Sequence, residues 1–369
     1  MNFVVKGWCP GALRPMMSGD GLVVRVRPHM ARLTKVQAHG LALASLAHGN
    51  GLIDLTARGN LQLRGVRPEA HLALLDDLDG LGLIDADEAA ERRRNIVVSP
   101  FSTANDGTSQ VVTALMQVLA QPEFASLPSK FGFAVDTAGC VLQQVSADIR
   151  IERSEQGWLV RPDGFATGAL VKNVGAAVAQ LLTWFLARGV VDGRGRMAAL
   201  AGQNLPAGFN HPYTPASFAP QPGGHDMGHM VGFAFGEIPA QTLLALAKYD
   251  VRITPWRMIL IEGATSAPDL PGLIVDAADP RQRVTACTGA PGCPQALQQT
   301  RQLAACLAQF VPQGQHLHVS GCAKGCAHPG PADVTLVATI AGFDLIRNGR
   351  AADKAAGTYV TGTNPFKVL

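Results

Sequence analysis

The chain reads Asp20-Gly-Leu-Val-Val-Arg-Val-Arg-Pro28 near its start, and this stretch alternates in the manner of a β-strand. Helical spacing of apolar residues follows over residues 33–46, and a second alternating run covers residues 53–64. We therefore expect a strand, a helix and a strand. The same order of elements returns in the second half of the chain, over residues 230–236, 240–247 and 251–261.

Two further pairs of segments repeat in the same order. The run Val97-Val-Ser-Pro, followed by helical spacing over 109–120, resembles Thr285-Ala-Cys-Thr, followed by helical spacing over 296–310. Residues 147–151 and 157–164 resemble residues 332–336 and 342–349. These repeats predict a duplicated α+β fold with a cofactor at the pseudo-twofold interface. Chance similarity is the alternative, and several matches in one order weigh against it.

Four cysteines lie in two close pairs in the last quarter of the chain, Cys287 with Cys293 and Cys322 with Cys326. Each pair belongs to a turn rich in Gly and Pro, where the backbone can wrap tightly around a cofactor. Such turns also direct N–H groups at cluster sulfurs. The pattern indicates the ligands of an iron-sulfur cluster.

Three alternatives compete with a cluster. Disulfide bonds are disfavoured because the chain is large, has no export signal and carries seven cysteines, an odd number. Structural zinc is a stronger rival, although zinc pairs usually have two to four intervening residues and five separate Cys287 from Cys293. The third alternative is a set of buried free thiols, which we expect for Cys9, Cys140 and Cys306 but not for four cysteines paired within glycine-rich turns.

The composition excludes some classes of function. With 31 basic and 28 acidic residues and a net charge of +3, the chain lacks the basic excess of a nucleic-acid-binding protein. Its 369 residues predict roughly two to three domains, and 47% hydrophobic residues support a substantial core. Neither the N-terminus nor the apolar run 174–187 suits a secretory signal or a membrane span. We expect a soluble cytoplasmic protein with no nucleic-acid or membrane partner.

Polar side chains share one face of the strands expected in the first copy. Arg25 and Arg27 alternate with valines, and positions 58, 60, 62 and 64 carry Arg, Asn, Gln and Arg. A solvated surface is the ordinary explanation, but no acidic residue compensates these charges on the same face. Several forked cations suit a ligand fringed with carboxylates, since arginine can pair with each carboxylate through two hydrogen bonds.

The chain resembles the sulfite/nitrite reductase superfamily over nearly its whole length and, within it, the precorrin-3B synthase family. The resemblance rests on the four paired cysteines, on Arg94-Asn95, and on the stretches Cys9–Pro28, Thr56–Gln62 and Leu127–Phe131. The opening stretch favours the synthase family over the reductases. The resemblance implies a pseudo-twofold α+β fold with two ferredoxin-like half-domains and two mixed α/β cofactor-binding lobes.

The expected divisions of the chain follow from this fold. Residues 1–93 form the first ferredoxin-like half-domain and 94–205 the lobe without cysteine ligands, while the Pro/Gly-rich segment 206–224 is a linker. Residues 225–275 form the second half-domain and 276–369 the iron-sulfur lobe.

The resemblance also implies an activity. It is that of an oxidoreductase, an oxygen-dependent monooxygenase that hydroxylates precorrin-3A at C20 and closes a γ-lactone in aerobic cobalamin biosynthesis. Its [4Fe-4S] cluster, held by the four paired cysteines, receives electrons from an external NADH-linked donor. The tetrapyrrole substrate is expected to bind Arg25, Arg27, Arg58, Arg94 and Lys130. No catalytic residue is assigned, and the oxygen-activating centre is open, with a mononuclear non-haem iron as one candidate.

Two alternative functions remain. The first is a siroheme-dependent sulfite or nitrite reductase, in which Cys326 bridges the cluster and the siroheme iron. Gly132 counts against it, because the reductase pattern has a second lysine there. The second is a non-catalytic iron-sulfur electron carrier or tetrapyrrole-binding protein. The run Gly193-Arg-Gly-Arg-Met-Ala198 superficially fits a dinucleotide fingerprint, but no clear strand precedes it, so no nicotinamide site is expected on this chain.

Overall fold

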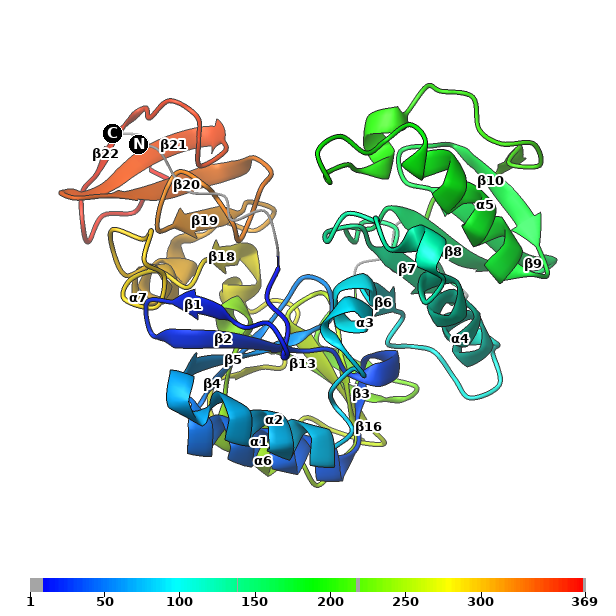
Figure 1. Ribbon diagram of the computed structural model, residues 1–369. Helices are drawn as coiled ribbons and strands as arrows, with labels where there is room; N and C mark the ends of the chain where they lie inside the picture. The colour runs from blue at the N-terminus through cyan, green and yellow to red at the C-terminus, as the bar shows by residue number, and fades with distance from the viewer. Residues whose placement is uncertain (1–8, 138, 217–219, 368–369) are drawn as a thin grey trace.

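The computed structural model describes residues 9–137, 139–216 and 220–367. A central body of two antiparallel sheets lies below two lobes, one from the middle of the chain and one from its C-terminal part (Figure 1). Helices cover the lower side of the body, and the lobes stand on the opposite side. Among the described residues, no helix is long and apolar enough to cross a membrane.

The body contains two sheets of similar construction. The first has the spatial order β1 (Met16–Ser18), β2 (Gly21–Val26), β5 (Leu61–Val66), β4 (Leu52–Leu55) and β14 (Glu237–Pro239). The second has the order β12 (Gly223–His225), β13 (Gly228–Phe233), β16 (Met258–Glu262), β15 (Val251–Ile253) and β3 (Arg32–Leu33), and β17 (Leu273–Ile274) also pairs with β13.

Each sheet takes one edge strand from the other copy. β14 pairs with β4, with Glu237 opposite Asp54, and β3 pairs with β15, with Arg32 opposite Arg252. Arg301 forms ion pairs with both Glu237 and Asp54 and so fastens the first exchanged strand. The two copies therefore share one body. The predicted chain divisions stay predictions, and residues 1–8, 138, 217–219 and 368–369 of those segments lie outside the described part.

Three helices pack against the body: α1 (Lys35–His48), α2 (His71–Gly80) and α6 (Ala240–Leu246). α1 begins at Thr34, whose hydroxyl accepts the N–H of Gln37, while the Gln37 side chain accepts the N–H of Thr34. One apolar core joins α1 to strands of both copies, and Leu41, Val24 and Ile259 are fully buried in it. This shared core fixes the positions of the two sheets relative to each other.

The two lobes have the same topology. The middle lobe has the sheet order β11 (His211–Pro212), β10 (Thr167–Val171), β9 (Gly157–Pro162), β8 (Ile149–Ser154), β7 (Phe133–Asp136) and β6 (Ile96–Val98). The C-terminal lobe has the order β18 (Val284–Ala286), β19 (Leu317–Ser320), β20 (Ala332–Thr339), β21 (Gly342–Gly349) and β22 (Gly357–Tyr359). In the middle lobe β6, β7 and β8 are parallel neighbours and β9 is antiparallel to β8. In the C-terminal lobe β18, β19 and β20 are parallel neighbours and β21 is antiparallel to β20.

Helices connect the strands of both lobes. α3 (Glu88–Arg93) leads into the middle lobe, where α4 (Thr108–Leu119) and α5 (Val174–Leu186) pack on the sheet, and α7 (Arg301–Leu307) packs in the C-terminal lobe. Short 3₁₀ helices lie at His29–Ala31, Pro68–Ala70, Pro122–Phe124, Met197–Leu200, Ala234–Gly236, Pro280–Arg283 and Ala308–Phe310. The repeated order of elements confirms the predicted pseudo-twofold α+β fold.

One expectation about the repeats is wrong. Residues 53–64 form a hairpin rather than one strand, because the Thr56 hydroxyl accepts the N–H of Arg58 and bends the chain between β4 and β5. Residues 251–261 likewise form β15 and β16 around a turn, in which Arg257 has a φ of +60°. Arg58 therefore lies in a turn and not on the polar face of a strand.

Candidate functional site

The two cysteine pairs lie at one edge of the C-terminal sheet. Cys287 follows β18 directly, and Cys322 comes shortly after β19. Because β18 and β19 are parallel neighbours, with Ala286 opposite Val319, their carboxyl ends meet at the same edge. The fold thus brings together two turns that are well separated in the sequence.

Hydrogen bonds shape the first of these turns around its sulfur. The Gly321 N–H donates to Cys287 Sγ at 3.1 Å, and the Thr300 hydroxyl donates to the Cys287 carbonyl at 2.6 Å. A Cβ at Gly321 would lie 2.6 Å from the Cβ of Ala296 and 3.4 Å from Cys287 Sγ, so only glycine fits. A sulfur that accepts a backbone N–H is typical of a cluster ligand.

The segment before α7 belongs to the same site. A helix expected from residue 296 begins only at Arg301, and that part of the prediction is wrong. The Leu297 N–H donates to the Gly321 carbonyl at 2.9 Å, and the Gln298 carbonyl accepts the Ala290 N–H at 2.9 Å. These bonds join the segment to both cysteine turns and replace the bonds of a helix.

The cysteine thiols lie close enough to affect one another. Burial raises the pKa of Cys322, and the neighbouring Cys293 and Cys287 raise it further, while the backbone N–H of Lys324 opposes the rise. Burial also raises the pKa of Cys326, with smaller contributions from the other three cysteines. The raised pKa values of Cys322 and Cys326 suit a site where a cationic cluster balances the thiolate charge.

Among the described residues, no three His, Cys, Asp or Glu side chains converge on a point that a single metal ion could occupy. A four-iron cluster binds each cysteine sulfur through a different iron, so its ligands need not converge as those of one zinc ion do. The residues present therefore fit a cluster: four cysteines, one sheet edge, and a backbone donor to sulfur.

The body holds the first cysteine turn through one carbonyl group. The Gly292 carbonyl accepts hydrogen bonds from the Ser18 hydroxyl at 2.6 Å, the Gly19 N–H at 3.2 Å and Arg64 Nη2 at 2.7 Å. A Cβ at Gly19 would lie 1.9 Å from the Pro291 carbonyl oxygen. The hairpin of β1 and β2 therefore packs tightly against the turn that carries Cys293.

A second arginine of the body reaches the other cysteine turn. Arg257 Nη2 donates to the Ala327 carbonyl at 3.1 Å, next to Cys326. Burial lowers the pKa of Arg257, and nearby Arg301 lowers it further. The sequence alone indicates no role for Arg257, because its contact depends on how the C-terminal lobe packs on the body.

Three of the five basic residues expected to bind substrate gather where the body meets the middle lobe. Arg25 donates to the Gln62 side chain at 2.7 Å, and Arg58 Nη2 donates to the Lys130 carbonyl at 3.3 Å. Arg58 Nη1 is buried and has no partner among the described residues. Burial lowers the pKa of Arg58; nearby Cys9 opposes this, while Arg196 and Arg25 add to it. The arrangement offers cationic donors to an anion.

The other two basic residues form internal ion pairs. Arg27 is only 6% exposed and lies 3.3 Å from Glu91, and burial lowers its pKa to about 10. Its Nε and Nη1 have no hydrogen-bond partner among the described residues. Arg94 contacts Asp85 at 2.5 Å and donates to the Arg27 carbonyl at 2.9 Å. Their charges are thus partly neutralised within the protein.

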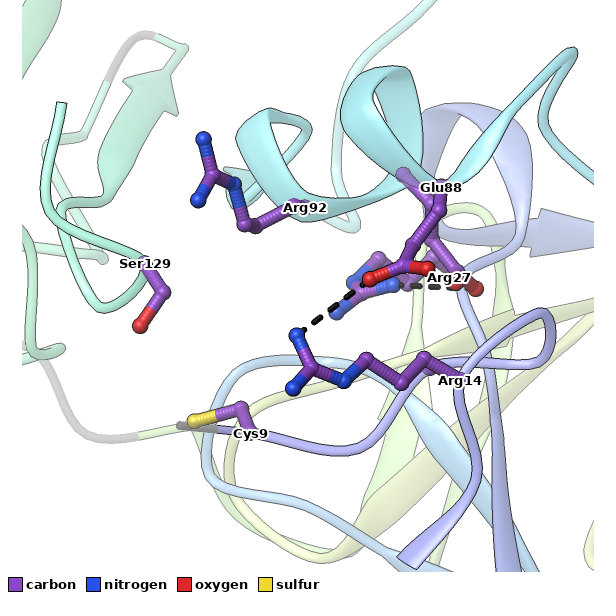
Figure 2. A pocket seen from close by; sticks show the side chains of 8 residues that line it. Cys9, Arg14, Arg27, Glu88, Arg92 and Ser129 are labelled. Atoms are coloured by element: carbon purple, nitrogen blue, oxygen red, sulfur yellow. Dashed lines mark hydrogen bonds and ion pairs between the residues drawn. The ribbon is translucent and has the colours of Figure 1, made fainter. Parts of the chain in front are cut away.

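A cavity of about 130 Å³ opens beside Arg27 (Figure 2). It is lined by Cys9, Gly11, Arg14, Arg27, Glu88, Glu91, Arg92 and Ser129. Arg14 forms an ion pair with Glu88 at 3.3 Å. Sequence reasoning assigned no role to Arg14 or Arg92, although Arg14 belongs to the opening stretch that carries the resemblance. The lining of this cavity therefore carries both acidic and basic side chains, in contrast to the cationic group around Arg58.

The opening stretch is fixed by a buried carboxylate. Glu91 accepts the N–H groups of Ala12 and Leu13, at 2.5 Å and 3.2 Å. Gly11 leaves no space for a side chain, because a Cβ there would lie 2.0 Å from Glu91 Oε2. These contacts place Cys9 at the cavity, where it faces Arg14 and Ser129 (Figure 2). The Cys9 thiol is therefore a cavity-lining group and not part of a core.

Comparisons with known proteins agree with this architecture. Residues 14–81 match the family model of the nitrite/sulfite reductase ferredoxin-like half domain. The structure of the Mycobacterium tuberculosis NirA protein has the same fold, with a TM-score of 0.63 and 18% identity over 92% of this chain and 76% of that chain.

Relatives of two kinds share sequence with this chain. Ferredoxin–nitrite reductase of Leptolyngbya laminosa is 30% identical over 38% of this chain and 29% of its own length. That of Synechococcus elongatus is 31% identical over 33% of this chain and 26% of its own length. Precorrin-3B synthase of a Sinorhizobium species is 31% identical over 94% of this chain and 83% of its own length. Because this last similarity spans nearly the whole chain, the protein belongs to the precorrin-3B synthase family.

Proposed function

We propose that this protein converts precorrin-3A to precorrin-3B in aerobic cobalamin biosynthesis. The observation that carries the proposal is its whole-chain similarity to the Sinorhizobium precorrin-3B synthase. In this reaction C20 is hydroxylated and a γ-lactone closes with the ring A acetate. One oxygen atom of O₂ enters the product, the other leaves as water, and two electrons come from an external NADH-linked donor.

The C-terminal lobe would hold the cofactor. Cys287, Cys293, Cys322 and Cys326 would bind a [4Fe-4S] cluster, which when bound supplies one-electron transfer. The protein contributes the Gly321 N–H to Cys287 Sγ and the partial burial of Cys287, Cys293 and Cys322, two features that tune the reduction potential of such clusters. No residue is proposed for the oxygen-activating centre, for which a mononuclear non-haem iron is one candidate.

The basic residues would position the tetrapyrrole. Arg25, Arg58 and Lys130 present donors where the body meets the middle lobe, and each charge-assisted bond to a carboxylate contributes about 1.5–3 kcal/mol. Arg27 and Arg94 would act mainly through their ion pairs, which fix the wall that carries Arg25. The spare donors of Arg27 remain available to a ligand group that enters the cavity.

A siroheme-dependent sulfite or nitrite reductase is the alternative, since two ferredoxin–nitrite reductases share sequence with part of the chain. Gly132 distinguishes the two, because it stands where the reductase pattern supplies a second lysine. Its N–H donates to Asp148 Oδ2 at 2.9 Å, and it has no side chain that could reach an anion. Extraction of siroheme from the purified protein would favour the reductase and overturn our proposal.

The direct test is a reaction with labelled oxygen. Protein reconstituted with iron and sulfide is mixed with precorrin-3A, a chemical reductant and ¹⁸O₂, and the pigment is analysed by mass spectrometry. We expect a product heavier by one labelled oxygen atom, and none without O₂. A reducible cluster with no oxygenated product would instead identify a non-catalytic electron carrier or tetrapyrrole-binding protein.

A further inference from the structure

A second cavity, of about 340 Å³, lies on the middle lobe beside Lys130. One wall is the segment Pro128–Lys130, and the other is the turn Gly193–Arg196 together with Ala199. Its lining contains three basic residues and no acidic residue. Because an exposed wall of one charge sign is unusual unless it serves a ligand, this cavity is a candidate anion site.

The turn that forms the second wall is rigid. Val191 and Arg194 exchange two backbone hydrogen bonds, of 2.8 Å and 2.9 Å, around Asp192 and Gly193, which both have positive φ. This is the geometry of a tight two-residue hairpin turn. A Cβ at Gly195 would lie 1.9 Å from the Gly189 carbonyl oxygen, so the turn packs directly on the end of α5.

One buried carboxylate fixes the two walls relative to each other. Asp148 is 1% exposed, and it accepts from Arg196 Nε at 2.8 Å and from the Met197 N–H at 2.9 Å on one side. On the other side it accepts the Gly132 N–H at 2.9 Å, two residues after Lys130. Asp148 therefore balances the charge of Arg196 and sets the spacing between the turn and the lysine segment.

Two of the three basic residues that line this cavity have side chains without a partner in the described part of the chain. The Lys130 ammonium and the Arg194 guanidinium form no hydrogen bond or ion pair with any described residue. The Lys130 backbone is nevertheless held in place, because its carbonyl accepts from Arg58. Lys130 and Arg194 line the same cavity as the apolar Pro128 and Ala199, and this combination suits a ligand that has an apolar ring edge and several carboxylates.

We propose that Lys130 and Arg194 bind peripheral carboxylates of the tetrapyrrole substrate, in a subsite that the Gly193–Arg196 turn builds and Asp148 positions. This inference rests on the proposed function and adds to it a specific substrate contact outside the body. The side chain of Arg194 projects from a rigid turn, so its contribution is selectivity for a carboxylate-rich rim rather than catalysis.

The test compares binding of two tetrapyrrole probes by fluorescence quenching. Uroporphyrin III carries acetate and propionate side chains, whereas coproporphyrin III lacks the acetates. We expect Arg194→Gln to weaken uroporphyrin binding about tenfold, corresponding to about 1.4 kcal/mol, and coproporphyrin binding less. Arg194→Lys should recover part of the loss. The matched control is Arg188→Gln, because Arg188 is an exposed arginine that lies two residues after the end of α5 and does not line the cavity.

The outcomes separate this subsite from the proposed function. If Arg194→Gln binds both probes as the wild type does while Arg58→Ala binds them weakly, the subsite is refuted and tetrapyrrole binding stands. Wild-type protein that binds neither probe would contradict both proposals. Equal losses for Arg194→Gln and Arg188→Gln would show a general charge effect and would also refute the subsite.

Discussion

Arg64 Nη2 lies 2.7 Å from the carbonyl oxygen of Gly292, and this bond connects a central strand of the body to the turn that carries Cys293. Asp20 holds the same guanidinium at 2.7 Å, so the arginine is fixed from both sides. A strand of the first copy thereby positions a ligand turn of the second. Cluster assembly should therefore depend on residues far from the cysteines.

Replacement of Arg64 tests this dependence. Arg64→Met keeps the apolar stem but leaves Asp20 without its cation and removes one of the two arginines that pair with the buried Asp54. We therefore expect the free energy of unfolding to fall by about 3 kcal/mol. The iron content should fall with it. Arg67→Met is the control, because the exposed Arg67–Glu69 pair should contribute less than about 1 kcal/mol. Denaturant unfolding measures the free energy of unfolding, and iron analysis measures cluster content. Equal effects of the two variants would show that Arg64 does not position the turn that carries Cys293.

A methyl group at Gly19 tests the same contact by steric means. The Cβ of Gly19→Ala would meet the Pro291 carbonyl oxygen at 1.9 Å, so the hairpin or the cysteine turn must shift. We expect a loss of about 1–3 kcal/mol in stability and a lower cluster occupancy, seen in the visible absorption spectrum. Gly80→Ala is the matched control, since no atom lies within 4 Å of its added Cβ. A fully loaded Gly19→Ala protein would show that the hairpin does not position the turn.

The sequence predicts the cysteine ligands and the duplicated fold because both leave local signals. Cys287 and Cys322 lie in Gly-rich turns, and strand and helix periodicity repeats in both copies. The exchange of β3 and β14 leaves no such signal, since each is a short edge strand whose partner is set by how the copies pack. For the same reason the contact from Arg64 to Gly292, 228 positions away, could not be predicted.

The basic residues show the limit of strand alternation. The pattern places Arg25 and Gln62 on strands, and these residues lie opposite each other in the sheet. It gives Arg27 the same role as Arg25, although Arg27 pairs with Glu91 in the interior. Glu91 lies on α3, and nothing in the sequence near Arg27 indicates that α3 packs there. The sequence alone indicates no role for Arg194, because an arginine between two glycines fits no strand or helix pattern, and only the fold brings it to the same cavity as Lys130.

Asp136 provides a pH-dependent prediction. Burial raises its pKa from 3.8 to about 6, and neighbouring Glu152 adds to the rise. The folded state therefore binds a proton more readily than the unfolded chain, and this group lowers stability as the pH rises from about 4 through 6. At neutral pH the ionisation of Asp136 therefore lowers the free energy of unfolding by about 3 kcal/mol.

Asp136→Asn removes that titration and keeps an oxygen to accept the Leu142 N–H. We expect the variant to be more stable than the wild type by up to about 3 kcal/mol at pH 7.5, with the difference shrinking towards pH 4.5. Urea unfolding at the two pH values measures it. A difference that does not change with pH would mean that Asp136 titrates normally in the folded state.

Arg58→Ala separates substrate binding from the cluster. Arg58 contacts the Lys130 carbonyl and lies near Cys9 and Arg25, but no contact links its side chain to the cysteine turns among the described residues. The variant should keep the iron content and absorption of the wild type and bind uroporphyrin III about tenfold more weakly, as expected for one lost charge-assisted bond. Unchanged binding would remove Arg58 from the substrate site.

Cys322→Ser tests the cluster assignment itself. Serine preserves the size of the side chain but is a poor ligand for iron in such a cluster, so iron, sulfide and oxygenation of precorrin-3A should all be lost together. The turn should remain folded, because Ser320 Oγ donates to the backbone carbonyl of residue 322 and not to its sulfur. Cys306→Ser alters an exposed cysteine outside the turns and should change none of these properties. A Cys322→Ser protein that still oxygenates precorrin-3A at the wild-type rate would exclude this cysteine as a cluster ligand needed for the reaction.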